Sequence, residues 1–337
     1  MKKPRIFITH SFLALLITVL EVLFLTRASL SYKPWQVFLL LYNFFALFGF
    51  RFLVSSIFKS FQSRRMNKKP YLQIEKQLLK VPFKDTFKLI GKKYTEFGDF
   101  DGYIIEASGI RFIAKSVIDL QTLNNIVNRK TYDFIITRPT IIIDVGANVG
   151  YSSLWFANKE QVKRVYGFEP VLPTYEQALQ TIFLNPQLQG KIELKNFGLS
   201  NNAQETTISY DPNHSTISST IFSVQDNFEP EEYSTKISIK LVDAKPIFLQ
   251  IANRKLIEDD SLVLKMDCEG CEYQIFECFD PYIWNSIDVI MMEIHGHDYE
   301  RIHTKLIQQG FSVFSINHQN HPVFEHLCDV YAIRTPK

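Results

Sequence analysis

The sequence predicts an α/β fold built on a mainly parallel sheet with helices on both faces. Three observations predict it. The apolar, β-branched run 140–145 turns through Gly146 and Gly150 into a helical pattern, which is typical of a strand, a tight loop and a helix. A second apolar run, 164–168, ends at Glu169. From there to residue 334, apolar runs and helical patterns alternate, which indicates a parallel sheet covered on both sides.

The same patterns predict the order of the elements. We expect the strands of the main sheet near 140–145, 163–168, 191–197, 261–267, 287–294, 310–316 and 326–334. The expected helices lie near 150–159, 173–184, 270–279 and 298–309. Two further strands, near 204–210 and 236–242, flank the polar segment 211–235.

The residues before the main sheet predict a linker and a cap. Residues 66–90 combine a basic run with a short helical pattern. Residues 102–114 alternate and turn at 107–109, which is a hairpin signal, and 116–133 predicts a helix. We therefore expect a linker and cap over 66–138 and a core domain over 139–337.

The first 65 residues predict a membrane anchor. Residues 1–70 hold 11 basic residues and one acidic residue, whereas the remainder holds 26 basic and 34 acidic residues. The apolar runs 6–25 and 35–58 are each long enough to cross a hydrocarbon core of about 30 Å as a helix. Basic residues flank the pair on both outer sides, which favours two transmembrane helices with the rest of the chain in the cytoplasm. A helix pair lying on the membrane surface and a cleaved signal peptide are the alternatives.

The four cysteines do not suggest a disulfide framework, so we expect a reducing compartment. Cys268 and Cys271 have the spacing of a zinc-binding pair, but the sequence holds no second C-x-x-C pair to complete a tetrahedral site. We therefore expect both cysteines to be small buried side chains between a strand and a helix. No metal site is predicted.

The glycine loop distinguishes between classes of cofactor. A dinucleotide site uses G-x-G-x-x-G, whose glycines let the backbone approach a pyrophosphate. Here Asn148 stands in the place of the second glycine, which crowds a diphosphate but offers a side-chain amide to an uncharged or zwitterionic ligand. This D-x-G-x-N-x-G loop resembles the cofactor loop of class I S-adenosylmethionine (SAM) methyltransferases. Glu169, at the end of the next strand, is placed to accept hydrogen bonds from ribose hydroxyls.

A second polar cluster follows the strand expected at 261–267. Ligands of such sheets lie beyond the carboxyl ends of the strands, so polar residues there are site candidates. Lys265 and Asp267 are two residues apart and share one face of the strand, and Glu269 begins the next helix. A purely structural ion pair of Lys265 with Asp267 or Glu269 is the alternative to a site. On the following strand, Glu293 and His295 also share a face.

Five runs carry a resemblance to one family: D-V-G-A-N-V-G-Y-S (144–152), F-E-P (168–170), N-F-G-L-S (196–200), K-M-D-C-E-G-C-E (265–272) and M-E-I-H (292–295). In order and spacing they resemble the FkbM-type methyltransferases, over roughly 140–316. The resemblance implies a Rossmann-like class I methyltransferase fold with a seven-stranded sheet, SAM as the cofactor, and methyl transfer to a hydroxyl oxygen, often of a sugar or polyketide.

The resemblance also implies the site residues. It places Asp144, Gly146, Asn148, Gly150 and Glu169 at the cofactor, and we add Tyr151 and Asn196 as further cofactor candidates. Lys265, Asp267, Glu269 and Glu293 fall on charged positions that face the cleft, and we add Asp243 to Glu293 on the acceptor side.

We therefore expect a membrane-anchored SAM-dependent O-methyltransferase. Its acceptor would be a hydroxyl of a saccharide, a glycolipid or a lipid-linked glycan at the cytoplasmic membrane face, and we expect no nucleic-acid partner. Asp267 and Glu269 are the expected proton acceptors, and Lys265 would keep one of them ionised. His295 is a further candidate, because its unperturbed pKa of about 6.5 suits a base at neutral pH. A catalytically inactive, membrane-tethered binding module and a nicotinamide oxidoreductase are the alternatives.

Overall fold

The structure is a computed structural model that describes residues 74, 76–78, 83–94, 100–210, 235–295, 299–317 and 327–335. The chain divides into two compact units, 1–65 and 66–337, and every described residue belongs to the second. The expected membrane segments 6–25 and 35–58 lie outside the described residues. Within the described ranges, no helix is both long and apolar enough to span a bilayer.

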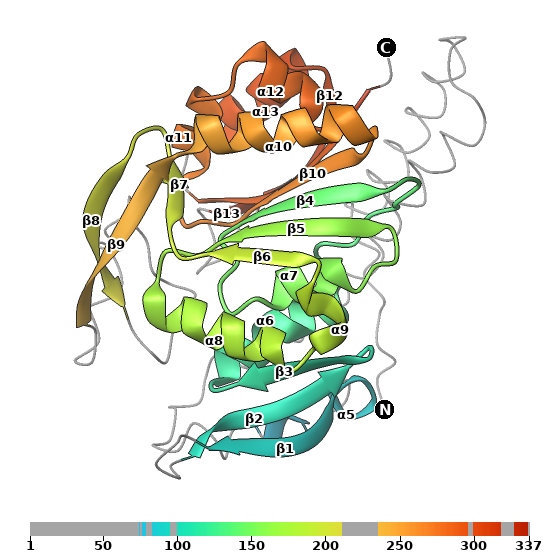
Figure 1. Cartoon of the computed structure of the whole chain (residues 1–337), viewed down its shortest axis with the longest axis vertical. Helices are drawn as coiled ribbons and strands as arrows, with labels where there is room; N and C mark the ends of the chain where they lie inside the picture. Colours follow the sequence, from blue (N-terminus) through green and yellow to red (C-terminus); the bar gives the residue numbers. More distant parts are fainter. Residues whose placement is uncertain are drawn as a thin grey trace, which may run out of the picture. The chain divides into compact units, whose positions relative to one another are not determined.

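The main sheet has seven strands in the order β12-β13-β11-β10-β4-β5-β6 (Figure 1). Their bounds are β4 (Thr140–Val145), β5 (Val162–Phe168), β6 (Ile192–Lys195), β10 (Ser261–Met266), β11 (Val289–His295), β12 (Phe311–Asn317) and β13 (Leu327–Arg334). All pairings from β11 to β6 are parallel, and β13 runs antiparallel to both of its neighbours. The expected mixed sheet with a closing C-terminal hairpin is confirmed. The strand order reverses between β4 and β10, which is where such sheets bind ligands.

Helices cover both faces of this sheet (Figure 1). One face carries α6 (Val117–Val127), α7 (Tyr151–Ala157), α8 (Leu172–Phe183) and α9 (Pro186–Gln189), and the other carries α10 (Ala244–Glu258), α11 (Glu272–Glu277), α12 (Pro281–Ser286) and α13 (Tyr299–Gln308). Leu264 and Met266 pack into the apolar core on the α10–α13 side. Because side chains alternate along a strand, Lys265 points to the opposite face, as its spacing predicted.

Helix α10 was not among the expected helices. Lys255 lies on its buried side, only 8% exposed, and breaks the apolar stripe that sequence reasoning looks for. The ammonium group is compensated by an ion pair with Asp288 at 2.9 Å.

A smaller sheet, in the order β7-β9-β8, stands beside the main one. It consists of β7 (Gly198–Ser200), β8 (Gln204–Tyr210) and β9 (Thr235–Asp243). The two strands expected near 204–210 and 236–242 are confirmed as β8 and β9, and they pair antiparallel. Most of the polar segment between them, 211–234, lies outside the described residues.

The cap is a three-stranded antiparallel sheet, β1 (Lys88–Tyr94), β2 (Phe100–Ala107) and β3 (Ile110–Ala114), preceded by the short α5 (Phe83–Thr86). The expected hairpin is confirmed as β2 and β3, with Ser108 and Gly109 at positive φ in its turn. The expected helix over 116–133 ends at Val127 and begins with a capping box between Ser116 and Asp119. Strand β1 was missed because its three lysines and one glycine hide the alternation.

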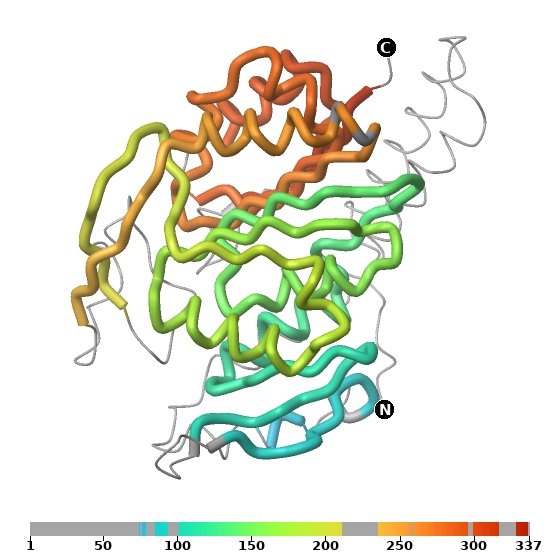
Figure 2. Tube along the Cα trace, in the orientation of Figure 1, coloured from blue at the N-terminus to red at the C-terminus, as the bar shows by residue number. Residues whose placement is uncertain are grey.

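The cap is fastened to the core along β3 (Figure 2). The side-chain amide of Asn185 pairs with the backbone of Arg111, accepting from its N–H at 2.9 Å and donating to its carbonyl at 2.7 Å. The hydroxyl of Tyr151 donates to the carbonyl oxygen of Ile113 at 2.7 Å, and its ring meets Phe112 edge-on. Both contacts tie β3 to the helices that cover the main sheet.

Candidate active site

The glycine loop after β4 crosses the end of β10, and the two backbones lie in contact at Gly146 and Asp267. Gly146 has a φ of 75°, and a Cβ atom placed there would lie 1.8 Å from the carbonyl oxygen of Asp267. Only glycine can occupy this position. The N–H groups of Gly146 and Ala147 both donate to the carbonyl of Phe168 at 3.0 Å, so the loop is held between β10 and β5.

A buried ion pair between Lys265 and Asp144 supports the loop. The Lys265 ammonium lies 3.0 Å from Asp144 Oδ1, and both side chains are at most 2% exposed. Lys265 also donates to the carbonyl of Gly146 at 2.6 Å, and the hydroxyls of Ser152 and Ser153 donate to Asp144 Oδ2. Burial alone would lower the pKa of Lys265, but the adjacent Asp144 carboxylate outweighs it and raises that pKa. Lys265 therefore stays charged.

A structural ion pair of Lys265 with Asp267 or Glu269 was the alternative to a site. The structure instead pairs Lys265 with Asp144, its register partner across the β10–β4 pair. Its ammonium therefore supports the cofactor loop instead of facing an acceptor. Asp144 is fully buried beneath the loop, and its place in the cofactor site stays a prediction.

Glu169 forms the second wall of the cofactor site. Its Oε2 accepts from the Asn148 N–H and its Oε1 from the Val171 N–H, each at 2.9 Å. The side chain is buried, and burial raises the pKa of Glu169 to about 7. A carboxylate oxygen can accept two hydrogen bonds, so each oxygen keeps one acceptor position for a ribose hydroxyl.

The remaining predicted cofactor residues have distinct positions. Asn148 sits at positive φ, and its buried Oδ1 has no hydrogen-bond partner among the described residues. Such an orphaned acceptor, next to the free positions on Glu169, fits the amino and hydroxyl donors of SAM. The Asn196 amide donates to the Glu169 and Pro170 carbonyls and so orders the turn. Tyr151 instead points its hydroxyl at the cap, away from the loop.

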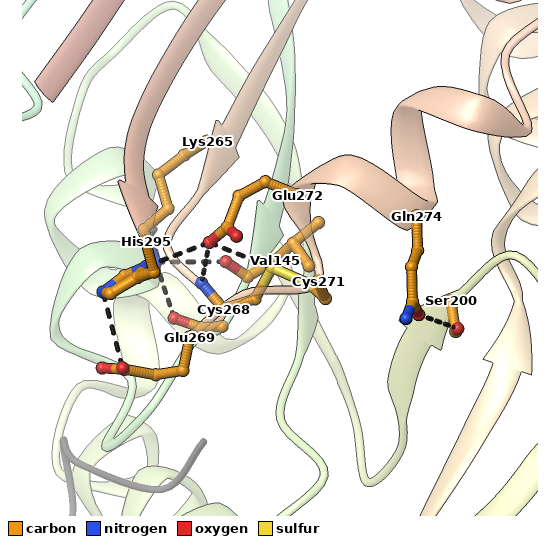
Figure 3. The surroundings of a disulfide bond; sticks show 10 residues. Val145, Ser200, Lys265, Cys268, Glu269, Cys271, Glu272, Gln274 and His295 are labelled. Atoms are coloured by element: carbon orange, nitrogen blue, oxygen red, sulfur yellow. Dashed lines mark hydrogen bonds and ion pairs between the residues drawn. A yellow bond between two sulfur atoms is a disulfide. The ribbon is translucent and has the colours of Figure 1, made fainter. Parts of the chain in front are cut away.

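A cluster of carboxylates surrounds His295 at the carboxyl ends of β10 and β11 (Figure 3). His295 Nδ1 lies 3.2 Å from Glu272 Oε1, and His295 Nε2 lies 3.4 Å from both Glu269 Oε2 and Glu293 Oε1. Glu272 is fully buried, and its Oε1 also accepts from the Cys268 N–H. Sequence reasoning gave Glu272 no role, although it follows Glu269 by three residues on the next helix.

The carboxylates control the charge of this cluster. Burial alone would lower the pKa of His295, but Glu269, Glu272 and Glu293 outweigh it and raise that pKa well above its usual value. Burial also raises the pKa of Glu269 to about 8 and, together with Asp267, raises the pKa of Glu293. The unperturbed pKa of about 6.5 that was assumed for His295 therefore does not apply here, and a role of His295 as a base stays a prediction.

Asp267 lies between the cluster and the cap. The hydroxyl of Tyr132 donates to its Oδ2 at 3.0 Å. Burial, together with Asp267, raises the pKa of Tyr132 well above its usual value, so the phenol keeps its proton and remains a donor. Tyr132 was missed because it comes from the cap segment, where no motif marks it. Asp243 caps α10 by accepting from the Lys245 N–H, at the end of the smaller sheet.

Cys268 and Cys271 form a disulfide (Figure 3). This corrects the expectation that both are unpaired, buried side chains. The intervening Glu269 and Gly270 both have positive φ, which turns the chain back on itself and brings the two Cα atoms to 5.6 Å. Such a local reversal is not visible in cysteine counting. Cys278 and Cys328 are the free cysteines of the described residues.

Comparison with known proteins gives the family. The methyltransferase FkbM domain matches residues 144–313, half of the chain. The chain therefore belongs to the FkbM methyltransferase family. It is a SAM-dependent methyltransferase, and its Rossmann-like fold has the seven-stranded mixed sheet described above. The family assignment removes the nicotinamide alternative and the inactive-module alternative.

Individual relatives are more distant. The chain is 26% identical over 211 residues to the methyltransferase sdnD of Sordaria araneosa, covering 56% of this chain and 80% of that protein. Among solved structures, it aligns with an FkbM methyltransferase from Methylobacillus flagellatus KT at 16% identity and a TM-score of 0.38, covering 62% of this chain and 47% of the other. It aligns with TrmK of M. capricolum, solved with S-adenosylhomocysteine, at 12% identity and a TM-score of 0.35, covering 64% and 68%. At these scores the two structures add no argument to the family match.

Proposed function

We propose that the chain transfers the methyl group of SAM to a hydroxyl oxygen of a saccharide or a lipid-linked glycan. The observation that carries this proposal is the group of carboxylates at the ends of β10 and β11. Asp267 and Glu269 lie beside the cofactor loop, and the carbonyl of Asp267 touches the position of Gly146. An acceptor placed here would meet groups that can take a hydroxyl proton.

SAM supplies a methyl group that is already activated by its sulfonium. The protein must hold the acceptor oxygen in line with that group, which lowers the barrier mainly through orientation. Glu169 and the loop at Gly146 hold the cofactor side. Asp267 or Glu269 accepts the hydroxyl proton, a contribution of about 10²–10⁴ in rate. His295 contacts the Glu269 and Glu293 carboxylates through Nε2 and so helps to position them.

An N-terminal membrane anchor, which the sequence predicts, would favour an acceptor in the lipid. The apolar runs 6–25 and 35–58 and their basic flanks fit an anchor with both ends in the cytoplasm. An enzyme held at that surface would meet acceptors that are themselves in the lipid, such as lipid-linked glycans. The proposal therefore places the enzyme at the cytoplasmic face of a membrane.

The test is methyl transfer from labelled SAM into a membrane lipid extract, followed by identification of the labelled product. We expect the label as a base-stable ether on a glycan hydroxyl. In single turnovers at saturating SAM, Asp267→Asn or Glu269→Gln should slow transfer by about 10²-fold or more while SAM binding is retained. The control is Glu277→Gln, an exposed carboxylate on α11 that pairs only with Arg301 in the described contacts. Label on nitrogen or carbon, or wild-type rates in both carboxylate variants, would contradict the proposal.

A further inference from the structure

We propose that Asp267, Glu293 and His295 bind a divalent cation, Mg²⁺ or Mn²⁺, beside the cofactor loop. One ligand atom of each of these three side chains lies within 4.8 Å of the others. The backbone explains their convergence. Met266 and Met292 are register partners across the parallel β10–β11 pair, so the residues that follow them leave the sheet next to each other. His295, two residues beyond Glu293, points to the same side.

Glu272 provides a second, independent observation. Its carboxylate is fully buried, lies 3.2 Å from His295 Nδ1 and has no hydrogen-bond partner on Oε2 among the described residues. Figure 3 shows it directed at the imidazole from α11. A buried carboxylate on one ring nitrogen is how proteins orient a metal-binding histidine, because it leaves the other nitrogen free for the ion. Here that other nitrogen, Nε2, lies 3.4 Å from both Glu293 Oε1 and Glu269 Oε2, so an ion bound there would replace these ion pairs.

The balance of charge points the same way. The carboxylates of Asp267, Glu272 and Glu293 gather around His295, and Asp329 is the register partner of Glu293 across the β11–β13 pair. Lys265 lies close by, but its ion pair is with Asp144. Glu272 is fully buried, and a buried carboxylate is costly unless a cation compensates it. A divalent ion held by the neighbouring side chains would add to that compensation.

The set of ligands selects the ion. Two carboxylates suit an ion that prefers oxygen and octahedral geometry, and the imidazole favours Mn²⁺ over Mg²⁺ within that group. Three protein ligands leave coordination positions for water or for oxygens of an acceptor. A hydroxyl bound to such an ion loses its proton more readily, and Glu269, beside His295, is placed to take it. This catalytic role rests on the proposed function, whereas cation binding does not.

The experiment uses the full-length chain, stripped with a chelator, and Mn²⁺ alone as the probe. Free Mn²⁺ is measured by electron paramagnetic resonance during a titration. We expect one Mn²⁺ per chain and a rise in the melting temperature with Mn²⁺ concentration. Glu293→Gln and His295→Gln should each weaken binding at least tenfold, Glu272→Gln should weaken it about 10–100-fold, and Glu277→Gln should leave it unchanged.

Absence of Mn²⁺ binding to the wild-type chain would overturn the inference, and so would wild-type affinity in both Glu293→Gln and His295→Gln. The wild-type titration keeps the test decisive even if a variant fails to fold. Methyl transfer is assayed separately with and without chelator. Transfer to a hydroxyl that persists without bound metal would refute the catalytic role of the cation and keep the proposed function. Specific Mn²⁺ binding without transfer to any hydroxyl would refute the proposed function and keep the cation site.

Discussion

At the scale of single residues, Lys265 shows how a correct pattern can suggest the wrong partner. Its spacing from Asp267 correctly predicts a shared strand face. Its actual partner, Asp144, lies 121 positions earlier in the chain and meets it only because β10 pairs with β4. The Lys265–Asp144 ion pair links the cofactor loop to β10, and Asp267 directly follows that strand. The cofactor side and the carboxylate side of the site therefore depend on the same ion pair.

Lys265→Met should destabilise the protein strongly. The substitution leaves the Asp144 carboxylate buried without its cation, which costs about 3–5 kcal/mol. The free energy of unfolding is measured by denaturant titration. The control is Lys195→Met on β6, whose ion pair with Glu193 is exposed and should contribute less than about 1 kcal/mol. Equal effects of the two substitutions would show that the buried pair does not hold the loop.

Glu169 should make stability depend on pH. Its pKa is about 7 in the folded protein against an ordinary value of 4.5. Between these values the unfolded chain releases a proton that the folded protein keeps, so stability is highest below pH 4.5 and falls as the pH rises toward 7. The loss is at most about 3.4 kcal/mol for this one group.

The check is denaturant unfolding of the SAM-free protein from pH 5 to pH 8. Glu169→Gln should flatten the decline relative to the wild type, whereas Glu176→Gln, an exposed neighbour on α8, should not. Glu169→Gln should also weaken SAM binding by about 1.5–3 kcal/mol, because an amide accepts ribose hydrogen bonds less strongly than a carboxylate. Identical pH profiles for the wild type and Glu169→Gln would show that this carboxyl is not perturbed.

At the scale of elements, the loop after β4 depends on Gly146. Gly146→Ala should abolish SAM binding and lower stability, because the new methyl group would overlap the Asp267 carbonyl. Gly109→Ala is a matched control, since Gly109 has a similar positive φ but open space around its Cβ position. It should cost only the conformational strain of about 1–2 kcal/mol and leave SAM affinity unchanged. If both variants lost SAM binding to a similar extent, the overlap with the Asp267 carbonyl would not be the cause of the loss in Gly146→Ala.

The turn between β10 and α11 depends on its disulfide. Reduction by a small dithiol, or Cys268→Ser with Cys271→Ser, should lower the free energy of unfolding by up to about 2 kcal/mol for so short a loop. Methyl transfer should fall more than SAM binding, because Glu269 and Glu272 are carried by this turn while the cofactor loop is held by β4 and β5. Cys278→Ser, on the far end of α11, is the control. Unchanged stability and transfer in the double variant would leave the disulfide without a structural role.

At the scale of the whole molecule, the cap and the core should behave as one folded body. Asn185 is 1% exposed and closes the backbone hydrogen bonds of Arg111 as a neighbouring strand would. Asn185→Ala should leave a backbone donor and a backbone acceptor without partners, at about 1–3 kcal/mol each. Relative to the wild type, hydrogen exchange in the Asn185→Ala variant should become faster in β3 and should change less in β4. If exchange in the cap is unaffected, other contacts hold the cap.

The sequence was enough for the repeating parts of the fold and for the cofactor class. Strands such as β4 and β5 are continuous apolar runs, and helix α8 follows a helical period, so local patterns reveal them. The cofactor loop is recognisable from its glycines and Asn148, because a tight turn after a strand needs particular residue types in a fixed local order. Elements whose polar residues are compensated at long range, such as α10 and β1, escaped this reasoning.

The sequence by itself therefore determined an FkbM methyltransferase with a SAM loop at 144–150 and charged motifs after two strands. Only the tertiary structure decided the partner of Lys265, the charge of His295, the disulfide at Cys268 and the place of Tyr132 beside Asp267. The physical reason is that periodicity and turn chemistry act between near neighbours in the chain. Ion pairs and pKa values instead depend on distance and burial, which strand register and helix packing set between residues far apart in sequence.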